Sequence, residues 1–257
     1  MVRVWKIMIP ELSGRKMRRA YVYLPDLYFE KPEMRFPVLY MFDGHNVFFD
    51  DHATYGKSWG LKDYMDKTGT PMIVAAVECH DGCHNERLSE YSPYTFVDPS
   101  FGKIKGKGKV TMDWMVHKFK PYIDATYRTL PDRDHTFISG SSMGGLMSVY
   151  AITAYNKYFG RAAALSPSLI FSPDKLETLF RTARIRKNTV LYMDYGEEEM
   201  KYHNGMKKMF SKSTAQLMER GLLVESRIIP AGSHCEASWE KQLPFFMAAL
   251  QYNLKNE

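Results

Sequence analysis

Short apolar runs recur along the chain and predict the strands of one sheet. Two runs near the N-terminus, 2–9 and 18–24, alternate apolar and polar residues, as half-exposed edge strands do. Continuous apolar runs are typical of parallel strands that are covered on both faces. Such runs occupy 37–42, 72–77, 136–139, 162–165 and 189–193, and a more mixed run follows at 223–229. The pattern therefore predicts eight strands.

Helical periodicity fills the intervals between these runs. Apolar residues recur three and four positions apart in 59–67, 112–127, 143–157, 173–181, 205–220 and 236–253. This alternation of strand and helix predicts an α/β fold, with a mostly parallel eight-stranded sheet and helices on both of its faces. Because no linker or internal repeat interrupts the alternation, we expect a single domain over 1–257.

One stretch, 79–109, shows neither pattern and mixes glycines, prolines, charges and aromatics. A loop of this length inside a compact domain is usually functional or mobile. It follows the strand at 72–77, so it leaves the carboxyl edge of the sheet, where open α/β folds bind ligands. We therefore expect a long active-site loop there, without regular structure.

Composition removes several classes of protein. The 257 residues are 45% hydrophobic and 25% charged, which is typical of globular chains rather than disordered or fibrous ones. The net charge of +6 is a mild excess, and glycines interrupt the one dense basic cluster, Lys103 to Lys109. That cluster is better interpreted as a solvated mobile loop, able to steer an anionic substrate or act as a lid, than as a nucleic-acid surface.

The cysteine content and the lengths of the apolar runs indicate in which cellular compartment the protein is expected. Three cysteines do not form a closed disulfide framework. The chain shows no apolar leader and no run of 18 apolar residues. We expect a cytoplasmic protein with neither a membrane nor a nucleic-acid partner.

The strongest chemical signal is Gly140-x-Ser142-x-Gly144, which stands between an apolar strand and an apolar helix. This is the pattern of a nucleophile elbow, in which a serine occupies a sharp strand-to-helix turn and the two glycines avoid clashes with the neighbouring strand and helix. The turn lifts the hydroxyl of Ser142 above the sheet. It also aims the backbone N–H of Met143 at the same space, as an oxyanion donor.

A serine nucleophile needs a base and an acid, which follow it along the chain in the order acid, then histidine. His203 and His234 are the histidines after Ser142. His234 follows the last strand at the carboxyl edge and is the predicted base, whereas His203 is interpreted as a solvated loop histidine. The acid should follow the strand at 189–193, and spacing alone does not choose among the candidates there. These candidates are Asp194, Glu197, Glu198 and Glu199.

Five segments in this order resemble the putative-esterase branch (esterase D and feruloyl esterase-like) of the α/β-hydrolase superfamily. They are Pro-Val-Leu-Tyr-Met-Phe-Asp-Gly-His-Asn-Val-Phe at 37–48, Arg-Leu-Ser-Glu-Tyr-Ser-Pro at 87–93, Gly-Ser-Ser-Met-Gly-Gly at 140–145, Gly-Glu-Glu-Glu at 196–199, and Gly-Ser-His at 232–234 followed by Trp239 and Leu243-Pro244. The branch includes feruloyl and acetyl-xylan esterases, S-formylglutathione hydrolases and siderophore esterases. The resemblance spans about 18–250.

The resemblance sharpens the choice of site residues. Relatives carry the triad acid, often aspartate, three residues after the glycine that Gly196 matches, which implies Glu199. The residue after the glycine of the third strand donates the second oxyanion N–H, which implies the backbone of His45. The segment at 87–91 is expected to brace the loop beside the site. Residues that could contact substrate are Asn46, Phe48, Trp59, Arg87 and Tyr91.

Together these residues predict a serine carboxylesterase that works through an acyl-enzyme and needs no cofactor. The expected substrate is a small acyl or aromatic acyl ester, with a carbohydrate as one candidate alcohol. An acyltransferase with the same triad and an esterase of the S-formylglutathione or siderophore type stay open as alternatives. A zinc site in Cys79-His80-x-x-Cys83-His84 is disfavoured, because structural zinc usually takes ligands from two separate segments and the second is missing.

Overall fold

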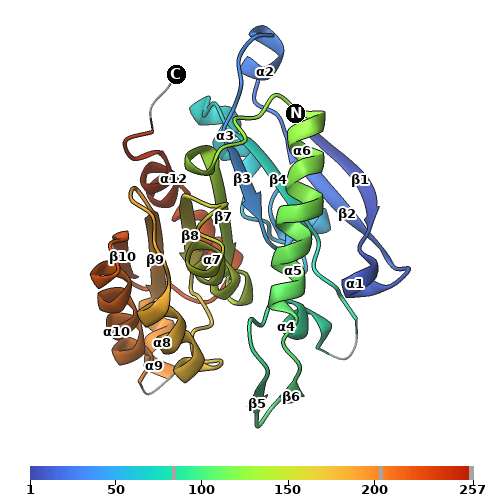
Figure 1. Cartoon of the computed structure of the whole chain (residues 1–257). Helices are drawn as coiled ribbons and strands as arrows, with labels where there is room; N and C mark the ends of the chain where they lie inside the picture. Colours follow the sequence, from blue (N-terminus) through green and yellow to red (C-terminus); the bar gives the residue numbers. More distant parts are fainter. Residues whose placement is uncertain (83–84, 203–204, 255–257) are drawn as a thin grey trace.

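An eight-stranded sheet forms the centre of the computed structural model, which describes residues 1–82, 85–202 and 205–254 (Figure 1). The strands lie in the order β1-β2-β4-β3-β7-β8-β9-β10. Their bounds are β1 (Val2–Met8), β2 (Met17–Tyr23), β3 (Val38–Met41), β4 (Ile73–Val77), β7 (Thr136–Ser141), β8 (Arg161–Leu165), β9 (Val190–Gly196) and β10 (Leu223–Ile229). Strand β2 runs antiparallel to both of its neighbours, and the other neighbouring pairs are parallel. The predicted α/β fold and its mostly parallel eight-stranded sheet are confirmed.

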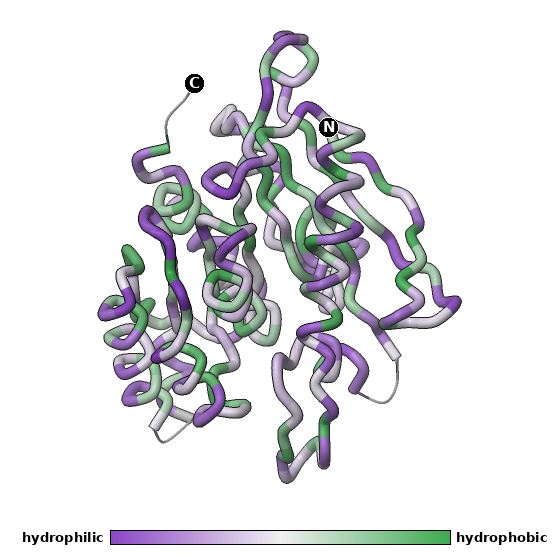
Figure 2. Tube along the Cα trace, viewed as in Figure 1, coloured by the Kyte–Doolittle hydropathy of each residue, from purple (hydrophilic) through white to green (hydrophobic). Residues whose placement is uncertain are grey.

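Helices cover both faces of this sheet because side chains alternate along each strand. In β8, for example, Ala162 and Ala164 join one apolar core, while Ala163 and Leu165 join the other. The first core is covered by α5 (Gly108–Trp114), α6 (Lys120–Thr126), α7 (Met143–Ala154), α8 (Pro173–Thr182) and α10 (Met206–Glu219). The second is covered by α3 (Leu61–Thr68), α11 (Glu236–Glu240) and α12 (Leu243–Gln251). Figure 2 shows the hydrophobic colours gathered along the central strands.

Helix α7, which begins directly after Ser142, is apolar on every side. Its residues Met143 to Thr153 are all buried. A helix that is apolar on all sides must be buried on all sides, and α7 is buried between the sheet and the neighbouring helices. The N-terminus of α7 is therefore fixed by the core at the carboxyl edge of the sheet.

Two expected helices are divided by prolines. The helix expected at 112–127 consists of α5, a π-helical turn (Met115–Phe119) and α6, because Pro121 cannot donate the next backbone hydrogen bond. The helix expected at 236–253 consists of α11 and α12, with Pro244 in the first turn of the second. Outside the 79–109 stretch, the described chain also contains three short helices that were not expected: α1 (Pro10–Ser13), α2 (Leu27–Glu30) and α9 (Glu197–Tyr202).

The expectation that 79–109 lacks regular structure is wrong. The stretch contains α4 (Glu86–Glu90) and a hairpin of β5 (Phe96–Asp98) and β6 (Gly102–Ile104), which projects at the bottom of Figure 1. The hairpin is anchored by Phe96, whose ring stacks on Phe171 with centroids 4.5 Å apart. The basic run therefore begins on β6 at Lys103, crosses an irregular connection at 105–107, and ends in α5, where Lys109 pairs with Asp113 at 2.5 Å.

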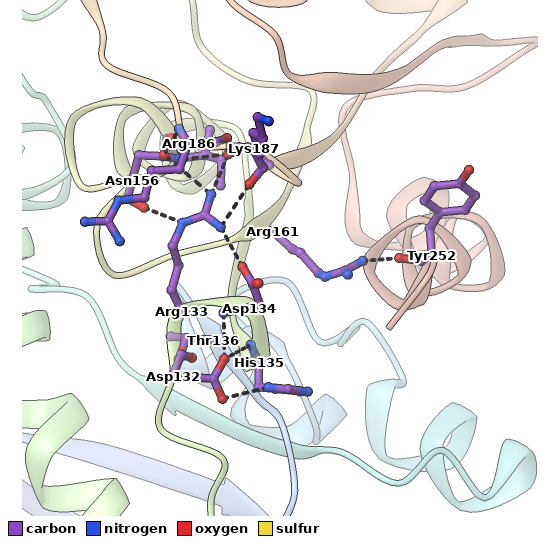
Figure 3. Close-up of polar contacts among 12 residues, drawn as sticks. Asp132, Arg133, Asp134, His135, Thr136, Asn156, Arg161, Arg186, Lys187 and Tyr252 are labelled. Carbon is purple, nitrogen blue, oxygen red and sulfur yellow. Dashed lines mark hydrogen bonds and ion pairs between the residues drawn. The ribbon is translucent and has the colours of Figure 1, made fainter. Parts of the chain in front are cut away.

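Arginines tie helix ends to the amino edge of the sheet (Figure 3). Arg133, just before β7, donates from Nε to the carbonyl of Asn156 at 2.7 Å and from Nη2 to Thr189 Oγ1 at 2.5 Å. Arg161 donates from Nη1 to the carbonyl of Tyr252 at 2.5 Å, at the end of α12. Burial lowers the pKa of both arginines. These contacts fill the amino edge of the sheet with structural hydrogen bonds, so we look for the functional site at the carboxyl edge.

None of the helices in the described ranges is long and apolar enough to cross a membrane.

Candidate active site

Ser142 occupies the turn between β7 and α7 in a strained conformation. Its φ of 57° and ψ of −119° lie outside the regions that residues with a side chain normally adopt. A Cβ on Gly140 would lie 2.8 Å from the carbonyl carbon of Gly144, and a Cβ on Gly144 would lie 3.0 Å from the Cβ of Phe42. Gly140 therefore has no room for a side chain, and Gly144 has very little. The geometry is that of a nucleophile elbow.

The hydroxyl of Ser142 lies beside a second serine. Ser142 Oγ is 3.4 Å from Ser168 Oγ, and the amide of Ser168 donates to the carbonyl of Ser142 at 3.0 Å. Across the described residues, the structure has no hydrogen bond between Ser142 and His234. Both side chains nevertheless line the same cleft. Hydrogen bonds between nucleophile and base often tighten only when substrate binds.

His234 and Glu199 form a hydrogen-bonded pair. His234 Nδ1 lies 2.7 Å from Glu199 Oε2, and the other carboxylate oxygen accepts from Ser166 Oγ at 2.6 Å and from the amide of Gly196 at 2.8 Å. Burial alone would raise the pKa of Glu199, but the hydrogen bonds from His234, Ser166 and Gly196 outweigh it and hold that pKa below its usual value. An ionised carboxylate accepts from Nδ1–H, so Nε2 keeps its lone pair as a proton acceptor.

A close backbone contact brings this pair together. A Cβ on Gly196 would lie 2.3 Å from the carbonyl oxygen of Gly232, so the loops after β9 and β10 touch where no side chain fits. The amide of Glu198 donates to the carbonyl of Gly232 at 3.0 Å. The contact fixes the segment that carries Glu199 against the one that carries His234.

The other carboxylates in this region have different partners. Asp194 is almost fully buried and accepts from the hydroxyl of Tyr192 at 2.7 Å, and burial raises its pKa to about 7. Glu197 accepts from the amide of Ala231, and Glu198 pairs with Lys201. Among the four candidates, Glu199 is the one that contacts His234 within the described part of the chain. His203 lies outside the described residues.

Two backbone amides, those of Met143 and His45, are the predicted oxyanion donors. Met143 is the first residue of α7, so the hydrogen-bond ladder of that helix does not use its N–H. His45 lies in the 3₁₀ turn Gly44–Asn46 that follows β3 and lines the cleft. Its ring Nε2 lies 3.0 Å from Thr54 Oγ1, which accounts for the imidazole without a catalytic role.

The turn that carries His45 is braced by Asp43 and the segment around α4. Asp43 is buried, with a φ of 53°, and accepts from Arg87 Nε at 2.8 Å and Nη2 at 2.7 Å. Burial opposes ionisation of Asp43, but the Arg87 guanidinium outweighs it and lowers the pKa of that carboxyl. The amide of Asp43 donates to the hydroxyl of Tyr91 at 3.1 Å. The turn that carries His45 is therefore held by charged and neutral contacts from one neighbouring helix.

A cleft opens on both sides of Ser142. Both halves are lined mostly by apolar surface. The half of about 720 Å³ has the larger polar share and is called the polar half, and the half of about 520 Å³ is called the apolar half. The polar half includes His45, Asn46, His80, Asp81, Glu86 and Glu236. The apolar half includes Pro167, Ile170, Phe171, Tyr195 and Met206. Both halves share Arg87, Leu88, Phe101, Ser142 and His234.

The residues expected to contact substrate divide into two groups. Asn46 and Arg87 line the cleft, and Asn46 Nδ2 also donates to Glu236 Oε1 at 3.3 Å. Phe48, Trp59 and Tyr91 are buried in the apolar cores and line neither half, because their rings pack under the site rather than beside it. Lining residues that the sequence did not single out include Phe101, Ser166, Ser168 and Phe171.

One set of side chains has the composition of a metal site. Ligand atoms of Asp43, His45 and Cys79 lie within 4.8 Å of one another. Arg87, however, occupies both oxygens of Asp43, and burial raises the pKa of the Cys79 thiol. A cation there would face a guanidinium and a neutral thiol, so the set does not fit a metal ion. In the segment where a zinc site was disfavoured, Cys83 and His84 lie outside the described residues.

Comparisons with known proteins agree on one family and fold. A family profile described as Putative esterase matches residues 12–250. The uncharacterized protein YbbA of Bacillus subtilis (strain 168) is 24% identical over 203 residues, which cover 78% of this chain and 76% of YbbA. An IroE-like serine hydrolase from Shewanella oneidensis superposes with a TM-score of 0.74 at 21% identity, over 98% of this chain and 79% of that one. A ferulic acid esterase superposes with a TM-score of 0.69 at 19% identity, over 97% and 96% of the two chains.

Replacing Asp194 by Asn should change how stability depends on pH. The pKa of Asp194 is about 7 in the folded chain against 3.8 ordinarily, so the folded state holds its proton between about pH 4 and 7 while the unfolded state releases it. The free energy of unfolding of the wild type should therefore fall relative to Asp194→Asn as pH rises through this window, by up to about 1.4 kcal/mol per pH unit. Urea denaturation of both proteins at several pH values measures it. Parallel stability curves would contradict the assignment.

Replacing Gly196 by Ala should separate the loops that carry Glu199 and His234. The new Cβ meets the carbonyl of Gly232, so we expect a loss of esterase activity together with about 1–3 kcal/mol of stability. Gly221→Ala is the matched control: Gly221 has a φ of 91° and open space around it, so its replacement costs about 1–2 kcal/mol and leaves the site intact. Equal activities of the two variants would show that the contact does not shape the site.

Proposed function

The chain belongs to the Putative esterase family of the α/β-hydrolase superfamily and is a serine esterase, and from this premise we propose that Ser142, His234 and Glu199 form its catalytic triad. The observation that carries the proposal is the 2.7 Å hydrogen bond between His234 and a buried carboxylate, in the cleft that also holds a serine on a strained turn.

Acylation begins when the hydroxyl of Ser142 turns from Ser168 towards His234. Nε2 of His234 takes the proton, and Ser142 Oγ attacks the carbonyl carbon of the ester. The carbonyl oxygen becomes an oxyanion that accepts from the amides of Met143 and His45, each worth about 3 kcal/mol in the transition state. Glu199 keeps Nδ1–H directed at itself and stabilises the imidazolium. The imidazolium then protonates the alcohol as the C–O bond breaks, leaving an ester on Ser142.

Deacylation repeats these steps with water. His234 removes a proton from a water molecule, whose oxygen attacks the acyl carbon. The imidazolium returns the proton to Ser142 Oγ as the acid leaves. Every proton that moves is thus carried by His234, and Glu199 stays ionised throughout, in keeping with the donors that surround it.

The shape of the cleft favours an ester with a sizeable group on each side of the carbonyl. The apolar half, with Ile170 and Phe171, suits a flat group such as an aromatic acyl chain. The polar half suits an alcohol rich in hydroxyl groups, because its hydrogen-bonding side chains converge on the same space. A ferulic acid esterase and siderophore hydrolases among the similar structures support this class.

Loss of the proposed nucleophile should abolish turnover. Ser142→Ala is expected to lower kcat/KM for a nitrophenyl ester by about 10⁴-fold or more and to eliminate labelling by a fluorophosphonate. Glu199→Gln should lower kcat by roughly 10²–10⁴-fold, because the amide no longer stabilises the imidazolium. Asp194→Asn is the matched control, since Asp194 bonds to Tyr192 instead of His234. Retained turnover in Ser142→Ala would refute the triad.

Truncating the apolar half should change substrate preference. Phe171→Ala is expected to lower kcat/KM for a hydroxycinnamoyl ester by about tenfold and to leave an acetyl ester nearly unchanged, because a small acyl group does not reach that wall. Kinetics on a matched pair of nitrophenyl esters measure the ratio. An equal loss on both esters would argue against an acyl-binding role for this half.

A further inference from the structure

We propose that Ser166 and Trp239 are positioning residues, which hold the triad acid Glu199 in register with His234 through a hydrogen-bond chain of fixed direction. The inference rests on the proposed triad and adds two residues that act through Glu199 and His234 rather than on the reacting atoms.

The chemistry of the groups fixes the direction of the chain. The indole nitrogen of Trp239 can only donate, and it lies 3.0 Å from Ser166 Oγ. Ser166 therefore accepts from Trp239 and has its own proton free to donate to Glu199 Oε1 at 2.6 Å. An ionised carboxylate can only accept. The order from Trp239 to Ser166 to Glu199 is thus the one arrangement that satisfies all three groups.

Burial makes each of these bonds strong. Ser166 is 2% exposed, Trp239 6% and Glu199 7%. Water does not compete for the hydroxyl or the indole N–H at such sites, and a hydrogen bond to an ionised group is stronger than one between neutral groups. The chain therefore restricts the rotation of the Glu199 carboxylate about its terminal bond.

Trp239 restrains the base as well as the acid. Its ring packs edge-on against the imidazole of His234, with centroids 5.1 Å apart and planes at 81°. The three members of the chain come from different elements: Ser166 follows β8, Glu199 belongs to α9 and Trp239 to α11. One tryptophan thus sets the position of His234 directly and that of Glu199 through Ser166.

The backbone of Ser166 is strained in a way that suits this role. Its φ of 44° lies in the left-handed region, which serine seldom adopts. The conformation is kept by hydrogen bonds from its amide to the carbonyl of Asp194 at 2.9 Å and from its hydroxyl to Glu199. Strain retained beside a catalytic pair is a mark of a positioning role.

The readout that separates positioning from packing is the pH profile. Without the hydrogen bond from Ser166, the negative charge of Glu199 is less neutralised and stabilises the imidazolium of His234 more strongly. Because catalysis needs the neutral imidazole, the acid limb of the kcat/KM profile should move to higher pH. The titratable groups that face Glu199 are His234, Asp194 and Tyr195. Because Asp194 itself titrates near neutrality, the profiles are best measured in an Asp194→Asn background.

The experiment compares Ser166→Ala, Trp239→Phe and the double variant with Ser139→Ala. Ser139 is a matched control, since its hydroxyl is buried on the neighbouring strand β7 and has no partner within the described chain. Ser166→Ala should lower kcat about tenfold, leave KM within about twofold and shift the acid limb upward by about half a pH unit. Trp239→Phe should also lower kcat and raise the acid limb. The double variant should have a kcat only slightly below that of Ser166→Ala, because each substitution interrupts the same hydrogen-bond chain.

Each outcome is decisive. A wild-type kcat and acid limb in Ser166→Ala, or fully additive losses in the double variant, would overturn the inference. Should Ser166→Ala fold poorly, Ser166→Gly removes the same hydroxyl and relieves the left-handed backbone. Turnover retained by Ser142→Ala would mean that the proposed triad fails. An inactive Ser142→Ala beside wild-type Ser166 variants would mean that only the positioning role fails.

Discussion

The backbone contact between Gly196 and Gly232 is the constraint on which the proposed acid and base depend. With no Cβ on either residue, the loops after β9 and β10 approach closely enough for the amide of Glu198 to donate to the carbonyl of Gly232. Glu199 and His234, 35 residues apart in the chain, then meet at 2.7 Å. Any side chain at the contact would separate the loops by more than a hydrogen bond can bridge.

Strain is concentrated at the carboxyl ends of three adjacent strands. Asp43 follows β3, Ser142 follows β7 and Ser166 follows β8, and their φ angles are 53°, 57° and 44°. Each of these residues turns the chain sharply, so that an amide or a side chain faces the cleft. The strands behind them are buried on both faces, and such close-packed elements can hold neighbouring residues in conformations that a loop alone would relax.

The sheet and the turn at Ser142 could be predicted from the sequence because each depends on residues that are close together in the chain. Apolar runs identify strands that are covered on both faces, and glycine at 140 and 144 follows from sterics within one turn. The proposed triad acid could not be chosen from neighbouring residues in this way. Four carboxylates follow β9, and the choice among them depends on the distant Gly232 loop, so the residues alone left it open and the family resemblance supplied Glu199.

The parts that sequence reasoning missed depend on tertiary contacts. Strands of three residues, as in the β5–β6 hairpin, are too short to show a period, and their anchor is the stacking of Phe96 on Phe171. An aromatic residue gives no sequence signal of whether it lines a cleft or a core, which is why Phe48, Trp59 and Tyr91 were expected at the cleft but lie beneath it. Ser166 stands in a Ser-Pro-Ser turn whose importance appears only once Glu199 and Trp239 are seen beside it.

The proposed triad combines a rigidly held acid, Glu199, with a nucleophile, Ser142, whose hydroxyl is free to rotate. Glu199 accepts three hydrogen bonds from three segments, so its carboxylate has one favoured orientation. Among the described residues, Ser142 Oγ has one hydrogen-bonding contact, which is 3.4 Å long and made with Ser168 Oγ, and it costs little to exchange this contact for one to Nε2 of His234. When substrate binds, the rotation of the Ser142 side chain is the one rearrangement that the mechanism requires. The charged and polar groups around His234 are already in position, and such preorganised electrostatics contribute strongly to acyl transfer.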